Sequence, residues 1–211
     1  MKSNNYVWYA SYGSNLSKDR FKCYIDGGTA MGADIRDPGC RDSSPPLKDK
    51  SVKINNELVF TGECFKWSNK GVAVIDFNKS ENVFTYARMY LITKQQFIDI
   101  VKQENGLKVE SKLNIDFDYA KNNESEIIFK NKMYGRILYV GQEEGYPIFS
   151  FTTCEPISKL YINEPSKEYL QMIGRGLKES HNLSKEEIVK YFISHKGVKN
   201  TYTEEDLIKI L

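Results

Sequence analysis

Four strand-like segments that follow one another between residues 51 and 92 constrain the fold more than any other feature of the chain. They are rich in β-branched and aromatic residues, and Asn, Gly, Lys and Ser fill the gaps between them. This composition is typical of strands joined by turns. The segments are Ser51–Asn55, Leu58–Phe65, Gly71–Phe77 and Val83–Ile92. We therefore expect a mainly antiparallel sheet in this part of the chain.

A helix is predicted directly after the fourth segment. Thr93 to Gln96 fits a capping box, in which a hydroxyl and a glutamine three residues later bind the free N–H groups of the first turn. Asn105 and Gly106 supply its stop. Later segments alternate apolar and polar residues and then change to helical spacing. They predict strands at Glu126–Phe129, Met133–Val140 and Ile148–Thr152, and helices that begin at Ser166, Ser184 and Thr203.

The chain of 211 residues suits one medium-sized domain. We expect a main domain over residues 1–180, with residues 181–211 as a helical extension packed on it. Between about residues 26 and 50 the chain holds Pro38, Gly39, Pro45 and Pro46 and has no sustained periodicity. A loop of this length inside a domain is either functional or disordered. We interpret it as a lid or specificity loop, with a solvated surface loop as the alternative.

Charge and cysteine content exclude several classes of protein. Lys and Arg total 30 against 28 for Asp and Glu, with both signs interspersed, so a nucleic-acid partner is not expected. The apolar runs are too short for a membrane span. Residues 1–5 carry no apolar signal region, which predicts a cytoplasmic protein. The four cysteines are widely spaced, so we expect free thiols. The oligomeric state is left open.

The turn Tyr12-Gly13-Ser14-Asn15-Leu16 is the clearest candidate for a binding loop. Aromatic and β-branched residues before it favour a strand, and Ser17 is a good N-cap for a helix after it. Gly13 permits a reversal that a Cβ would obstruct. Backbone N–H groups at the junction of a strand and a helix bind carboxylates or oxyanions. The alternative interpretation is a connecting turn without a binding role.

Few residues are available for other chemistry. The two histidines, His181 and His195, stand among polar and charged residues and are expected at the surface, so no metal site is predicted. No phosphate-binding glycine motif is present, and no cofactor is expected. Glu104 remains, in the last turn of the capped helix. The negative end of the helix dipole disfavours its ionised form, which predicts a raised pKa suited to proton transfer.

In this order, the motifs resemble those of the γ-glutamylcyclotransferase family. The resemblance spans most of the chain to about residue 180. It rests on the Tyr12–Leu16 turn, Leu58 to Phe60 with Trp67, Gly71 to Ile75, Tyr90 to Thr93, the helix that ends at Glu104, Tyr134 to Val140, and Pro165 to Tyr169 leading to Gly174.

The resemblance implies an α+β fold with a mixed, mainly antiparallel sheet that curls toward a barrel, flanked by helices. It also implies that the Tyr12–Leu16 loop (Tyr12, Gly13, Ser14, Asn15, Leu16) holds a γ-glutamyl group, that Glu104 is the catalytic acid and base, and that Tyr169 lines the substrate pocket. The implied reaction closes the substrate's own α-amine onto its γ-carbonyl. It yields 5-oxoproline and a free amine or amino acid.

Three departures from the family pattern keep alternatives open. Val101 stands where the family often has Asp, Asn105 stands where it often has Gly, and the residue 26–50 loop is longer than in simple members. The first alternative is a non-catalytic γ-glutamyl-binding or protein-interaction module on the same fold. The second is acyl transfer on a larger substrate. Arg20, Arg41 and Arg88 are possible carboxylate partners, each with a surface or structural role as the alternative.

Overall fold

The computed structural model describes residues 5–29 and 35–211, and its main element is an open six-stranded sheet. The strand order is β2-β5-β1-β8-β7-β6, antiparallel except for the β1–β8 pair. The strands of this sheet are β1 (Tyr6–Ser11), β2 (Lys48–Ile54), β5 (Thr85–Thr93), β6 (Ser125–Ile127), β7 (Arg136–Glu143) and β8 (Tyr146–Thr152).

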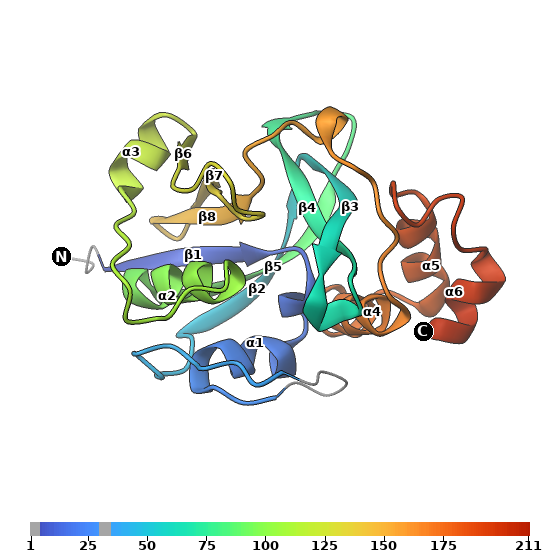
Figure 1. The fold of residues 1–211 in the computed structure, drawn as a ribbon, viewed down its shortest axis with the longest axis horizontal. Coiled ribbons are helices and arrows are strands. Elements are labelled where there is room, and N and C mark those ends of the chain that lie inside the picture. The colour runs from blue at the N-terminus through green and yellow to red at the C-terminus, as the bar shows by residue number, and fades with distance from the viewer. Residues whose placement is uncertain (1–4, 30–34) are drawn as a thin grey trace.

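A separate antiparallel hairpin stands beside this sheet. It consists of β3 (Asn56–Cys64) and β4 (Lys70–Lys79), joined through a short 3-10 turn at Phe65–Trp67. Figure 1 shows the hairpin between the six-stranded sheet and the C-terminal helices. The expected α+β class with a mainly antiparallel sheet is therefore confirmed. The two sheets stay open, and the strands do not close into a barrel.

The helices flank these sheets. They are α1 (Lys18–Asp26), α2 (Lys94–Glu104), α3 (Phe117–Asn122), α4 (Lys167–His181), α5 (Lys185–Ile193) and α6 (Glu204–Ile210). The caps predicted at Thr93, Ser166, Ser184 and Thr203 are all present, and the capping box of Thr93 and Gln96 is complete. The short helix α3 was not predicted. In the part of the chain that is described, none of the helices has the length and apolar character that a membrane crossing needs.

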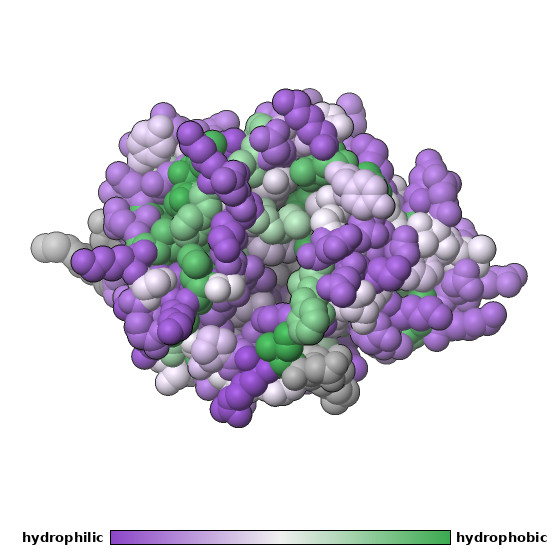
Figure 2. All heavy atoms as spheres, viewed as in Figure 1, coloured by the Kyte–Doolittle hydropathy of each residue, from purple (hydrophilic) through white to green (hydrophobic). Residues whose placement is uncertain are grey.

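Strand β1 is buried on both faces because it runs through the middle of the molecule. Trp8 and Ala10 belong to the core cluster shared with the hairpin and α4, whereas Val7 and Tyr9 belong to the cluster beneath α1 and α2. This alternation follows from the two-residue period of a strand. The surface differs from this apolar interior. Figure 2 shows hydrophilic residues over most of the face in view.

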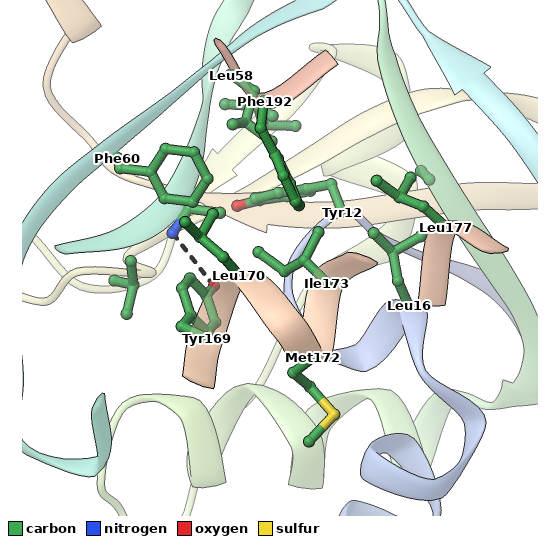
Figure 3. Packing of buried hydrophobic residues seen from close by; sticks show 14 of the residues in the cluster. Tyr12, Leu16, Leu58, Phe60, Tyr169, Leu170, Met172, Ile173, Leu177 and Phe192 are labelled. Carbon is green, nitrogen blue, oxygen red and sulfur yellow. Dashed lines mark hydrogen bonds between the residues drawn. The ribbon is translucent and has the colours of Figure 1, made fainter. Parts of the chain in front are cut away.

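The C-terminal helices share the core of the hairpin. Phe192 of α5 and Leu207 of α6 are fully buried in the same cluster as Trp8 and Leu170. Figure 3 shows Phe192 close to Leu58 and Tyr12, over the inner face of α4. Residues 181–211 thus pack against the rest of the chain, while their assignment as a separate extension stays a prediction.

Helix α4 packs directly on the turn that follows β1. A Cβ added at Gly176 would lie 2.4 Å from the backbone carbon of Leu16 and 2.5 Å from the backbone nitrogen of Ser17. No side chain can lie that close to another backbone, so only glycine fits here. Gly174 in the same helix is different, because its added Cβ would meet the tip of the flexible Leu211 side chain.

We expect Gly176→Ala to lower the free energy of unfolding by about 1–3 kcal/mol, the usual cost of overpacking a core. The matched control is Gly174→Ala, where Leu211 can move away and the alanine gains up to about 1 kcal/mol of helix propensity. Urea unfolding of both variants measures the difference. Equal stability of the two variants would contradict the close packing of α4 on the turn.

Candidate active site

A cavity of about 350 Å³ opens between β1, the hairpin and the ends of α2 and α4. Its walls include Tyr12 to Asn15 of the Tyr12–Leu16 turn, Glu104 from the end of α2, and Tyr169 from the first turn of α4. Much of the remaining lining is aromatic. These aromatic side chains are Tyr9, Tyr12, Tyr24, Phe65, Trp67, Tyr134, Phe151 and Tyr169. The fold therefore brings these three separate segments to one partly open, largely apolar cavity.

The turn after β1 is built around a short 3-10 helix, Ser14–Leu16. Gly13 precedes it with a φ of −107°, so the glycine is not required by its backbone angle. It is required by space, because an added Cβ would lie 2.9 Å from the Tyr169 hydroxyl oxygen. The prediction gave the reversal of the chain as the reason for glycine here, whereas the structure gives the Tyr169 side chain of α4.

The members of the turn face different surroundings. Tyr12, Gly13, Ser14 and Asn15 line the cavity, whereas Leu16 is fully buried in the hydrophobic core. The N–H groups of Ser14 and Asn15 begin the 3-10 helix and so have no acceptor within it. The predicted N-cap Ser17 starts α1, but its side chain makes no capping hydrogen bond.

Asn15 and Glu104 lie against each other inside the cavity. The side-chain Nδ2 of Asn15 donates to Glu104 Oε1 at 3.2 Å and lies 3.4 Å from the Tyr9 hydroxyl. The Oδ1 atom of Asn15 is buried and accepts no hydrogen bond from the described residues. A buried acceptor without a donor is costly, so this atom destabilises the site as it stands.

Glu104 is half-buried, and it lines the cavity. Burial raises the pKa of Glu104 above the ordinary value of 4.5, and the charges of Arg20 and Lys66 offset part of the rise. A hydrogen bond from Tyr24 favours the ionised form to a smaller extent. The predicted direction of the shift is confirmed. Its main cause is desolvation, whereas the prediction rested on the helix dipole.

Tyr169 and Tyr134 are fixed on one residue of the hairpin. The backbone N–H of Ala73 donates to the Tyr169 hydroxyl at 3.2 Å, the contact drawn as a dashed line in Figure 3. The Tyr134 hydroxyl donates to the Ala73 carbonyl at 3.1 Å. Both rings are therefore held in place along the cavity wall. Tyr134 was noted only as part of a strand, because an aromatic residue in a strand resembles core.

A buried ionic cluster lies beside the cavity. Asp37, from the residue 26–50 loop, pairs with Arg20 of α1 and with Lys66, whose Nζ lies 2.6 Å from Asp37 Oδ1. The side chains of Arg20 and Asp37 are only 2% and 1% exposed. This loop therefore contributes a charge next to the site, although its residues 30–34 lie outside the described residues. Sequence reasoning did not find Asp37 or Lys66.

The other candidates lie away from the cavity. Arg41 pairs with Asp99, and Arg88 pairs with Asp49 and Glu179, so both have structural ion pairs. The histidines are not simple surface residues. His181 is half-buried with Nε2 at 2.9 Å from the Ala87 carbonyl oxygen, and burial lowers the pKa of His195 to about 4.

The described residues offer little for metal or thiol chemistry. Among the described residues, no group of three or more His, Cys, Asp and Glu side chains is arranged to hold a metal ion. All four cysteines are free thiols, as predicted. Burial raises the pKa of Cys40 to about 12, so this thiol stays protonated at neutral pH.

Comparisons with known proteins agree with the resemblance in the sequence. No family model matches the chain. A solved structure described as a γ-glutamyl cyclotransferase superposes with a TM-score of 0.53 at 18% identity, over 97% of this chain and 98% of that chain. An uncharacterized protein from Homo sapiens gives 0.53 at 17% identity, over 98% and 99%. The predicted resemblance is thus confirmed at the level of the fold.

One curated protein is similar in sequence. Histone deacetylase 5 of Arabidopsis thaliana is 37% identical to the chain over 200 residues, which cover 88% of this chain. The matched region spans 30% of that protein's length.

Proposed function

We propose that the chain is a cyclotransferase that converts a small γ-glutamyl compound to 5-oxoproline and releases an amine or amino acid. The observation that carries the proposal is the pairing of Glu104 with Asn15 at a largely apolar cavity. A carboxylate with a raised pKa lies beside a buried acceptor that lacks a donor. A substrate ammonium group in the cavity donates to the Glu104 carboxylate. The shared fold with a γ-glutamyl cyclotransferase supports the same proposal.

The reaction needs few protein groups because the nucleophile belongs to the substrate. Ionised Glu104 takes a proton from the α-ammonium group, and the freed amine attacks the γ-carbonyl carbon. A C–N bond forms, and the carbonyl electron pair moves to oxygen. When that oxyanion collapses, the bond to the leaving nitrogen breaks and Glu104 gives the proton to this nitrogen. The new ring nitrogen still carries two hydrogen atoms and a positive charge, and it loses its second proton through Glu104 to the released amine, which departs as an ammonium ion. Atoms and charges balance without water, an oxidant or a reductant.

The cavity walls hold the substrate in the folded shape that this attack requires. Because the bound substrate already has its amine beside the carbonyl, ring closure loses less conformational entropy in the reaction step. The free N–H groups at the start of the Ser14–Leu16 turn suit the developing oxyanion, which fixed donors stabilise strongly. The aromatic walls exclude solvent, which strengthens these interactions.

The proposed role of Glu104 makes the reaction dependent on pH. The ionised carboxylate is the base, and burial holds its pKa above 4.5. We expect kcat/KM to rise with pH through an apparent pKa above that value, because this parameter reports ionisations of the free enzyme. Initial rates across the acid range, with circular dichroism at each pH, measure it. A flat profile, or an acid limb at or below 4.5, would contradict this assignment.

A panel of substrates tests the proposed reaction class. Glutathione, γ-glutamyl dipeptides and γ-glutamyl amines are incubated with the protein, and products are identified by mass spectrometry. We expect 5-oxoproline from at least one of them. Tight ligand binding without product supports a binding module instead. An acetyl-lysine peptide belongs in the panel because of the Arabidopsis relative's name, and acetate release from it alone would overturn the proposal.

A further inference from the structure

Lys66 lies where the main cavity meets a second one. The second cavity, of about 280 Å³, shares Ile35, Phe65, Lys66 and Trp67 with the first. Among the described residues that line the main cavity, Lys66 has the only positively charged side chain. Its side chain is 26% exposed, so the charge can reach a ligand.

The charges around Lys66 leave it able to hold an anion. Asp37 already pairs with Arg20 within the protein, and both side chains are almost completely buried. The ammonium group of Lys66 has three donors, and its hydrogen bond to Asp37 Oδ1 at 2.6 Å uses one of them. Asp37 therefore positions the Lys66 ammonium group. Because this one carboxylate is shared by Arg20 and Lys66, the cluster keeps a net positive charge.

Lys66 also acts on the carboxylate at the centre of the site. Its charge is among the interactions that offset the raised pKa of Glu104, as is that of Arg20. Arg20 is enclosed in the protein and does not line the cavity, whereas Lys66 does. Of these two charges near Glu104, only Lys66 is therefore open to a ligand.

We propose that Lys66 binds the α-carboxylate of the substrate and so restricts the site to γ-linked glutamyl groups. The α-carboxylate and the α-amine share one carbon atom, so an amine held by Glu104 places the carboxylate near Glu104. A charged partner is needed there because an unpaired carboxylate is costly in an apolar cavity. The N–H groups of the Ser14–Leu16 turn are then left for the γ-carbonyl oxygen. This inference rests on the proposed function for the identity of the substrate.

Binding of the product tests this role without any turnover. Calorimetric titration compares 5-oxoproline, which has the carboxylate, with 5-oxoprolinamide, which has a neutral amide in its place. For the wild-type protein we expect the acid to bind about 10- to 100-fold more tightly, as for hydrogen bonds to a charged group. Equal affinity for the two compounds would overturn the inference, and this comparison needs no variant.

Variants then locate the effect at Lys66. Lys66→Met is expected to weaken acid binding about 10- to 100-fold and to leave amide binding within about twofold. Lys66→Arg should retain most of the preference for the acid. Lys70→Met is the control, because Lys70 lies in the same hairpin, pairs with Glu164 and does not line the cavity. An unchanged acid preference in Lys66→Met would overturn the proposed role.

A kinetic comparison separates this inference from the proposed function. Two substrates are compared: γ-glutamyl methylamide with a free α-carboxylate, and the same compound with an α-carboxamide in its place. The methylamine leaving group has no carboxylate in either. If Lys66→Met lowers kcat/KM for the α-carboxylate substrate and leaves kcat/KM for the α-carboxamide substrate unchanged, the inference is supported. Acid-selective binding that depends on Lys66, without turnover of any substrate, would support the carboxylate site and contradict the cyclotransferase. Turnover that Lys66→Met leaves unchanged would support the cyclotransferase and contradict the carboxylate site.

Discussion

Glu104→Gln is expected to reduce 5-oxoproline formation by at least about 100- to 10,000-fold, the range typical for loss of a general acid or base. Glutamine keeps the size of the side chain and its contact with Asn15, but it cannot carry a proton between the two nitrogen atoms. The initial rate of product release at saturating substrate measures the loss.

The fold of this variant should be intact. A raised carboxyl pKa means that ionised Glu104 destabilises the folded state above that pKa, and glutamine removes this penalty. The free energy of unfolding at neutral pH is therefore expected to be equal to or higher than that of the wild type. Glu63→Gln is the matched control, because Glu63 is the other carboxylate among the described lining residues and is exposed. Equal losses in both variants would contradict the special role of Glu104.

Asp37→Asn is expected to lower the free energy of unfolding by about 3–5 kcal/mol, the cost of leaving a buried charge without its partner. The uncompensated charge is Arg20, whose side chain is 2% exposed. Burial alone would raise the pKa of Asp37, but Arg20 and Lys66 lower it below the ordinary value of 3.8. Asp37 therefore stabilises the fold at neutral pH and loses this effect as the pH falls through its lowered pKa.

Urea unfolding at pH 7 measures the loss, and two further variants show its origin. Glu155→Gln breaks an ion pair with Lys159 that is largely exposed, and it should cost less than about 1 kcal/mol. The double variant Arg20→Met, Asp37→Leu removes both buried charges and should recover much of the stability that Asp37→Asn loses. A cost for Asp37→Asn no greater than that of Glu155→Gln would show that the cluster is not a buried ion pair.

The fold was largely predictable because most of its elements have local signals. The capping box of Thr93 and Gln96 fixes the start of α2, and hydroxyl caps fix α4, α5 and α6. Helix α3 was missed because it is six residues long, too short for a periodic apolar pattern. The predicted curling toward a barrel does not reach closure, because the two sheets stay open.

The candidate site was only partly predictable, because its remaining members come together through contacts between distant segments. Asp37 lies in a loop without regular structure and meets Lys66 at a separation of 29 residues. Tyr24 recurs at helical spacing in α1 and so resembled an ordinary core residue. Leu16 belongs to the predicted loop motif, yet its side chain packs in the core beneath α4. Local patterns do not distinguish a cavity wall from a core.

Product analysis in ¹⁸O-labelled water tests the central claim most directly. Ring closure by the substrate's own amine uses no water, so the account predicts unlabelled 5-oxoproline and an equal amount of released amine, above a blank without protein. Glutamate carrying one ¹⁸O atom would show hydrolysis and would contradict the cyclotransferase. Recovery of intact substrate after tight binding would contradict it equally and would favour a binding module.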